Sequence, residues 1–114
     1  MRPDDTAIIY GNHRMTYREL AESSSELGGY LREIGVSPDE CVGLFVEPSI
    51  DLMAGVWGIL FAGGAYLPLS PEYPEERLRY MIEDAGVRVI VTQEAFAARL
   101  TELAPAGTRI VTRR

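Results

Sequence analysis

The side chains best suited to chemistry in this 114-residue chain are one histidine and one cysteine. His13 follows a Gly-Asn pair typical of a hairpin turn, which favours a surface residue over a general base. Cys41 opens an apolar run, where a cysteine is more often a small core residue than a nucleophile. A single histidine cannot build a His-rich metal site or a local Cys–His pair. We therefore expect no catalytic and no metal-binding residue in this chain.

Lysine is absent, since all 11 basic residues are arginine. Phosphate-binding loops of the G-x-x-x-x-G-K-[ST] type need a lysine against the phosphates, and Schiff-base chemistry needs a lysine amine. Gly58 and Gly63 have the glycine spacing of such a loop, but Gly64 and Ala65 replace its lysine and hydroxyl residue. Adjacent carboxylates fall at expected turns or helix starts, which indicates capping and solvation: Asp4-Asp5, Asp39-Glu40 and Glu75-Glu76. We expect no cofactor-binding residue either.

Size and charge limit the class of protein further. The chain is 46% hydrophobic and 25% charged, which suits one domain with one core. Seventeen acidic against 11 basic residues give a net charge of −6, which argues against a nucleic-acid partner. A single cysteine excludes an internal disulfide and favours the reducing cytoplasm. Because no apolar run approaches the roughly 18 residues of a membrane span, no membrane partner is expected.

The first third of the chain predicts a hairpin that leads into a helix. Residues 6–10 and 13–15 have the composition of two short strands, joined by a two-residue turn at Gly11-Asn12. Thr16 and Glu19 have the spacing of a capping box, in which each side chain accepts a backbone N–H of the other residue. A helix is therefore expected to begin directly after Thr16.

One stripe of the expected helix is suited to burial. Apolar and small residues recur at intervals of three and four: Tyr17, Leu20, Ser24, Leu27, Leu31 and Ile34. Gly35 is placed to end the helix in a left-handed conformation, and Pro38 prevents the helix from resuming.

The rest of the chain alternates strands with helices. Strands are expected at residues 41–46, 65–69, 87–91 and 109–112, and helices at 50–62 (with Ser49 as N-cap), 75–85 and 93–103. This alternation predicts an α/β fold, with the hairpin followed by β-α units that form a mostly parallel sheet. The order of the strands in the sheet does not follow from the pattern.

Residues 50–62 carry one charge, Asp51, and are otherwise apolar on nearly every side. The large side chains point around the whole circumference: Ile50, Leu52, Met53, Val56, Trp57, Ile59, Leu60 and Phe61. One face of a sheet cannot cover all of them. We expect the uncovered face to be hidden by self-association, by domain swapping or by the remainder of a larger domain.

Two stretches of the chain are specific enough to indicate a family. Residues 15–20 have the pattern [LM]-T-Y-x-E-L, with matches at Thr16, Tyr17, Glu19 and Leu20. Residues 60–71 and their sequel follow the pattern L-K-A-G-x-A-Y-[LV]-P-[LI]-D-P, with matches at Ala62, Gly63, Ala65, Tyr66, Pro68, Pro71, Tyr73, Pro74 and Arg77. These patterns resemble the first two core motifs of adenylation domains of nonribosomal peptide synthetases. Phe61 and Ser70 depart from the second motif, standing where that family usually has lysine and aspartate. We expect these motif residues to fix packing and turns.

The resemblance covers essentially all 114 residues and implies a fold, a reaction and partners. It implies part of the large N-terminal subdomain of an adenylate-forming enzyme. Such a domain, when complete, joins an amino acid to ATP-Mg²⁺ as aminoacyl-AMP and loads it onto the phosphopantetheine thiol of a carrier protein. The catalytic motifs of the family lie downstream, so residues 1–114 are expected to be a single partial domain, inactive alone. The implied partners are the remainder of the adenylation domain and a peptidyl carrier protein, with a condensation domain or an MbtH-like protein as further candidates.

Two other interpretations stay open at this stage. The chain could be a truncated, non-catalytic copy that docks on a carrier protein or synthetase partner. It could also be a fragment of an acyl-CoA synthetase-like ligase, although the run from Tyr66 to Pro74 argues against this interpretation. The amino acid is not named by this sequence, because the pocket-lining residues of the family also lie downstream.

Overall fold

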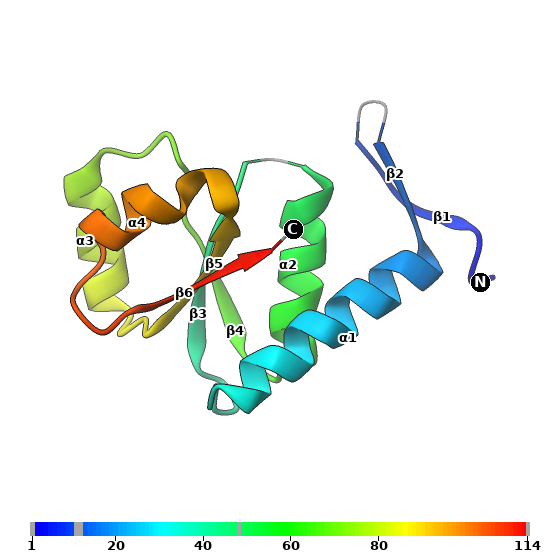
Figure 1. Cartoon of the computed structure of the whole chain (residues 1–114), viewed down its shortest axis with the longest axis horizontal. Helices are drawn as coiled ribbons and strands as arrows, with labels where there is room; N and C mark the ends of the chain where they lie inside the picture. Colours follow the sequence, from blue (N-terminus) through cyan, green and yellow to red (C-terminus); the bar gives the residue numbers. More distant parts are fainter. Residues whose placement is uncertain (1, 11–12, 48, 114) are drawn as a thin grey trace.

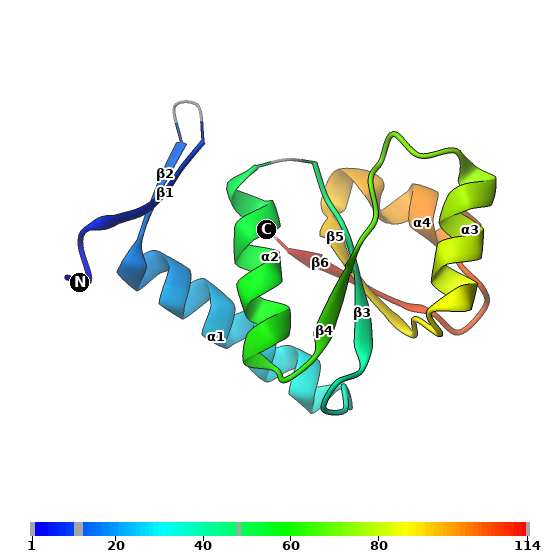
Figure 2. The same cartoon turned by 180° about the vertical axis from the view of Figure 1, so that it is seen from behind.

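A four-stranded parallel sheet with the strand order β4-β3-β5-β6 occupies the centre of the molecule, and an antiparallel hairpin, β1-β2, precedes it in the chain (Figures 1 and 2). The structure, a computed structural model, describes residues 2–10, 13–47 and 49–113. The turn predicted at Gly11-Asn12 lies outside the described residues.

The elements follow the predicted order from one end of the chain to the other. The strands are β1 (Thr6–Tyr10), β2 (His13–Thr16), β3 (Cys41–Phe45), β4 (Ala65–Pro68), β5 (Val89–Gln93) and β6 (Arg109–Arg113). The helices are α1 (Tyr17–Glu33), α2 (Ile50–Phe61), α3 (Glu75–Asp84) and α4 (Ala97–Leu103), the last preceded by a 3-10 turn at Glu94–Phe96. The predicted α/β class, a hairpin followed by β-α units, is confirmed. No helix in the described ranges is both long and apolar enough to cross a membrane.

The helices cover both faces of the sheet, and the strand order explains which helix covers which face. The chain passes from the inner strand β3 to the edge strand β4. It then crosses back over β3 to β5, and continues in that direction to β6 at the other edge. Connections of one hand place their helices on opposite faces when the direction of travel reverses. Accordingly, α2 lies on one side of the sheet and α3 and α4 on the other, while α1, which precedes β3, packs beside α2 (Figures 1 and 2). The hairpin lies at the end of the molecule far from α3 and α4.

Two apolar cores result, one on each face of the sheet. Alternate residues of β3 supply both, because Val42 and Leu44 face α1 and α2 whereas Phe45 faces α3 and α4. The core under α1 and α2 contains Leu27, Leu31, Val36, Val42, Leu44, Val46, Ile59, Ala62, Val89, Val91 and Val111. The other contains Phe45, Leu69, Leu78, Ile82, Val87, Ile90, Leu100 and Leu103. Burial on both faces accounts for the almost continuously apolar sequence of β3 and β5.

Three of the helices end at a glycine in the left-handed conformation. Gly35, Gly63 and Gly86 follow α1, α2 and α3 with φ angles of 95°, 87° and 65°. After α1, the N–H of Gly35 donates to the carbonyl of Arg32 and that of Val36 donates to the carbonyl of Leu31, each at 3.0 Å. This pair of bonds is a Schellman motif, which satisfies carbonyls at the end of the helix. The stop predicted at Gly35 is therefore confirmed.

The helix predicted at 93–103 begins later than expected. Gln93 is the last residue of β5, and its side-chain oxygen accepts the N–H of Glu47 at 3.1 Å. Residues 94–96 form a 3-10 turn, so α4 starts only at Ala97. Pairing of Gln93 with β6 across the sheet overrides the local helical pattern.

Two smaller differences have equally local causes. The strand predicted at 87–91 runs instead from Val89 to Gln93, because the N–H of Val87 donates to the carbonyl of Ile82 and closes α3. Ser49 is the N-cap residue of α2 as predicted, but its hydroxyl donates to the carbonyl of Glu47 at 2.9 Å rather than accepting a helical N–H.

Candidate functional site

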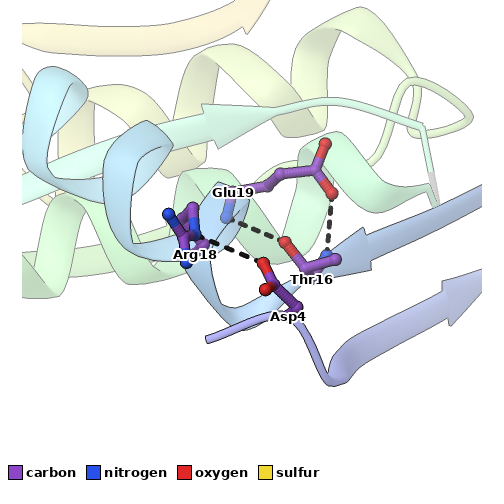
Figure 3. A network of polar contacts seen from close by, with 4 residues as sticks. All are labelled: Asp4, Thr16, Arg18 and Glu19. Atoms are coloured by element: carbon purple, nitrogen blue, oxygen red, sulfur yellow. Dashed lines mark hydrogen bonds and ion pairs between the residues drawn. The ribbon is translucent and has the colours of Figure 1, made fainter. Parts of the chain in front are cut away.

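The first motif forms the start of α1. The side chain of Thr16 accepts the N–H of Glu19 at 3.1 Å, and the carboxylate of Glu19 accepts the N–H of Thr16 at 2.9 Å (Figure 3). The predicted capping box is confirmed, and it fixes the direction in which α1 leaves the hairpin.

The residues before the hairpin are held against the same helix start. The side chain of Arg18 pairs with Asp4 at 3.3 Å (Figure 3). Two backbone hydrogen bonds join the same two segments. The N–H of Tyr17 donates to the carbonyl of Asp5 at 3.0 Å, and the N–H of Arg18 donates to the carbonyl of Pro3 at 2.8 Å. The N-terminal segment therefore forms a wall beside the start of α1.

A groove of about 1050 Å³ opens between this wall, α1 and α2. We call it the α1–α2 groove; it is lined by Arg2, Pro3, Tyr17, Arg18, Leu20, Ala21, Glu22, Ser24, Trp57, Leu60 and Phe61. It brings residues of the first motif, Tyr17 and Leu20, next to the residues that open the second. The side chains of Trp57 and Phe61 are 49% and 51% exposed. The uncovered face predicted for α2 is thus confirmed.

Two glycines that no sequence motif connects lie where α1 and α2 pack against each other. A Cβ on Gly58 would lie 2.5 Å from Cδ2 of Leu27, and one on Gly28 would lie 3.0 Å from the carbonyl oxygen of Gly58. The backbones of α1 and α2 therefore cross at close range. In the sequence, a glycine inside a predicted helix could have indicated this close contact. Glycine weakens a helix, so its presence there suggests that a neighbouring element packs against the backbone.

The second motif begins at the end of α2 and continues through β4. Ala62 is the buried C-cap of α2, and Gly63 supplies the left-handed turn after it. The N–H of Ala65 donates to the carbonyl of Glu40 at 2.9 Å and starts the parallel pairing of β4 with β3. Tyr66 is exposed on this edge strand, and Pro68 ends it. A proline is tolerated there because an edge strand leaves some N–H groups unpaired.

Beyond Pro68 the motif turns at the carboxyl edge of the sheet. The N–H of Tyr73 donates to the carbonyl of Ser70 at 3.1 Å, and the hydroxyl of Ser70 accepts the N–H of Glu72 at 3.2 Å. The guanidinium of Arg99, from α4, donates to the carbonyl of Pro71 at 2.8 Å. Ser70 thus forms the local turn bond through its hydroxyl.

The last residues of the motif begin α3. Pro74 is its N-cap residue, with φ −58° and ψ 150°. The guanidinium of Arg77 lies over the ring of Tyr73, 4.1 Å from its centroid. This cation–π contact joins the first turn of α3 to the preceding loop. Several motif residues thus form turns, caps and packing contacts, whereas Tyr66 is exposed and Tyr17 and Leu20 line the open groove.

The two side chains best suited to chemistry, Cys41 and His13, lie on different strands, β3 and β2. Burial and the charge of Glu40 both raise the pKa of the Cys41 thiol, which keeps it protonated and poorly nucleophilic. His13 is exposed at the start of β2. In the ranges that the structure covers, no three His, Cys, Asp or Glu side chains gather as a metal site would require.

One ion pair is set at the amino edge of the sheet. The carboxylate of Glu40, just before β3, accepts from the guanidinium of Arg88 at 2.6 Å and from the N–H of Ser37 at 3.0 Å. Burial alone would raise the pKa of Glu40, but these two partners together outweigh it and hold the pKa below its ordinary value of 4.5.

Comparisons with known proteins place this arrangement in a family. The profile of the family described as AMP-binding enzyme matches residues 1–113. Indigoidine synthase of Streptomyces lavendulae is 59% identical over 112 residues, which are 98% of this chain and 9% of that protein. The nonribosomal peptide synthetase FmoA3, in a form bound to α-methyl-L-serine-AMP, superposes with a TM-score of 0.89 at 39% identity, over 96% of this chain and 12% of its own. The chain belongs to the AMP-binding enzyme family.

The chain spans only a small part of these proteins. A solved N-terminal subdomain of NpsA from Klebsiella oxytoca, at 23% identity, shares the fold with a TM-score of 0.77. The matched region makes up 96% of this chain and 27% of that subdomain. The fold described above therefore recurs in relatives as one part of a larger unit.

Proposed function

We propose that residues 1–114 are a single partial domain, the N-terminal piece of an amino-acid-activating adenylation domain of a nonribosomal peptide synthetase. In this proposal the complete domain forms aminoacyl-AMP from an amino acid and ATP, releases pyrophosphate, and loads the aminoacyl group onto the phosphopantetheine thiol of a carrier protein. The observation that carries the proposal is the family match over residues 1–113, together with both motifs in ordered positions. The cytoplasm is the proposed location.

The role that we assign to this piece is structural. The capping box orients α1, and the turn from Ser70 to Pro74 joins β4 to α3 at the carboxyl edge of the sheet. Ligands of open α/β sheets bind outside the carboxyl ends of the strands, so a fixed turn there supports a neighbouring site. Mg²⁺ would assist the complete domain, but the described residues hold no fitting ligand set, and we assign no step to it.

A chimera tests this proposal. The present chain replaces the matching 112-residue segment of the indigoidine synthase of Streptomyces lavendulae, and amino-acid-dependent exchange of pyrophosphate into ATP is measured. We expect exchange in the chimera with the amino acid of the parent enzyme, because the substrate pocket is expected to lie downstream. The isolated 114-residue chain should give none, since it has no lysine and no phosphate loop.

One result would contradict the proposal. A chimera that melts cooperatively like the parent but exchanges no pyrophosphate would show that this segment does not support adenylation.

A further inference from the structure

Arg99, a residue of α4 outside both motifs, contacts the turn that the second motif makes at the carboxyl edge of the sheet. Its guanidinium donates to the carbonyl of Pro71 at 2.8 Å, in a partly buried position. The same group lies over the ring of Phe45, the last residue of β3, 5.4 Å from the ring centroid. One side chain therefore joins three segments: the first turn of α4, the end of β3 and the turn after β4.

The ring under the guanidinium is a rigid support. Phe45 is fully buried, and the ring of Phe96 meets it edge-on, with 5.3 Å between the two ring centroids. The buried hydroxyl of Thr92 donates to the carbonyl of Phe45 at 2.6 Å. Because close packing and a buried hydrogen bond leave Phe45 little freedom to move, a guanidinium that rests on its ring holds Pro71 at a fixed place.

The hydrogen bonds within the turn determine its shape rather than its place on the sheet. The N–H of Tyr73 donates to the carbonyl of Ser70, and the hydroxyl of Ser70 accepts the N–H of Glu72. At the two ends of the turn, Leu69 is buried in the core on the side of α3 and α4, and Tyr73 packs against that core. Pro71 lies between these ends, and Arg99 holds it from a different element.

The chemistry of this contact requires an arginine. A guanidinium is planar and delocalised, so it can stack on an aromatic ring and donate a directed hydrogen bond at the same time. The ammonium group of a lysine is a compact point charge without this geometry. None of the ion pairs among the described residues includes Arg99, so its role here does not come from neutralising a carboxylate.

We propose that Arg99 is a positioning residue of the complete adenylation domain: it holds the turn of residues 70–74 at the carboxyl edge of the sheet, and adenylation depends on the turn being held there. This inference rests on the proposed function. Ligands of open α/β sheets bind outside the carboxyl ends of the strands, so a turn at this edge borders the region where substrates are expected. A displacement of about 1 Å can lower the rate of an enzymatic reaction roughly a hundredfold. Arg99 acts through Pro71 and does not itself touch the substrate.

Amide hydrogen exchange in the 114-residue chain tests whether Arg99 holds the turn. We expect the amides of Glu72 and Tyr73 to exchange severalfold faster in Arg99→Ala and Arg99→Lys, because a turn that is not held opens more often. The amide of Glu19, in the capping box, is the internal reference and should not change. Arg79→Lys, at an exposed arginine of α3, is the matched control variant. Unchanged exchange at Glu72 and Tyr73 would overturn the inference.

Pyrophosphate exchange in the chimera of the preceding section tests whether adenylation depends on this contact. At a temperature at which all variants are folded, we expect Arg99→Ala and Arg99→Lys to lower kcat/KM by about tenfold or more, and Arg79→Lys to leave it unchanged. Millimolar guanidinium chloride, but not sodium chloride, should restore part of the activity of Arg99→Ala, because the free cation can occupy the vacated position. Full activity of the folded Arg99→Ala chimera would overturn the inference. A loss that guanidinium does not restore would indicate general destabilisation and would overturn it as well.

The outcomes separate this inference from the proposed function. A folded chimera with Arg99 intact that exchanges no pyrophosphate contradicts the proposed function, whereas hydrogen exchange in the 114-residue chain still decides whether Arg99 holds the turn. An active chimera whose Arg99 variants are equally active removes only the inference. If the chimera does not fold, the same variants are co-expressed with the following part of the indigoidine synthase as a second polypeptide, and pyrophosphate exchange is measured in that complex.

Discussion

Thr16 shows how a single side chain sets the direction of a whole element. Its hydroxyl accepts the N–H of Glu19, and the carboxylate of Glu19 returns the bond, which satisfies two donors at the start of α1. We expect Thr16→Ala to lower the free energy of unfolding by about 1 kcal/mol and Glu19→Ala by somewhat less. Thr16→Ser keeps the hydroxyl and is the control. Denaturant midpoints that do not move in the two alanine variants, singly or together, would place the start of α1 elsewhere.

Glu40 makes stability depend on pH at the residue scale. Its pKa in the folded chain lies below the ordinary value of 4.5, because Ser37 and Arg88 together outweigh the effect of burial. The folded state therefore binds fewer protons than the unfolded state, and the contribution of Glu40 is present above the unfolded pKa. It is lost as the pH falls through the lower, folded pKa.

The variant Glu40→Gln measures that contribution directly. We expect the difference in unfolding free energy between the original chain and Glu40→Gln to be largest near neutral pH and to shrink in acid. Chemical denaturation at several pH values measures it, with the exposed Glu83→Gln as control. A difference that stays constant from neutral pH into acid would mean that the ion pair with Arg88 does not act through the charge of Glu40.

Two glycines, Gly28 and Gly58, allow α1 and α2 to pack closely, and substitution of a glycine in these helices tests that contact. Gly58→Ala places a methyl group 2.5 to 2.9 Å from three atoms of Leu27, so the helices must separate. We expect a loss of about 1–3 kcal/mol of stability. Gly29→Ala, on the exposed face of α1 with nothing within 4 Å, should instead add roughly 0.5–1 kcal/mol. A stabilised Gly58→Ala variant would show that the helices are not in close contact there.

The elements differ in how much of them the sequence could predict. Caps and stops are local, so Thr16, Glu19 and Gly35 led to the correct ends of α1. The start of α4 was missed because Gln93 belongs to a sheet pairing with β6 that local periodicity does not contain. The N-cap position of Ser49 was predicted correctly, but its hydroxyl donates to the carbonyl of Glu47 and makes no bond to a helical N–H.

At the scale of the whole molecule, the sequence indicated that one face of α2 would remain uncovered, but not where the resulting groove would lie. The uncovered face followed from the apolar side chains that surround residues 50–62 on nearly every side. The position of the groove depends on the strand order and on the crossing of α1 over α2, which are long-range properties.

The same groove predicts how the isolated 114-residue chain behaves in solution. Trp57, Leu60 and Phe61 stay exposed when nothing follows, and apolar surface of this extent favours association of copies. We expect a dimer or larger species at low micromolar concentration by analytical ultracentrifugation, with the emission of Trp57 shifted to the blue as it forms. Trp57→Lys should shift the equilibrium to the monomer, and Tyr80→Lys should not. A chain that remains monomeric, melts cooperatively and binds no hydrophobic dye would show that this face of α2 is adequately covered within the 114 residues. It would then favour the non-catalytic docking module as the interpretation of the chain.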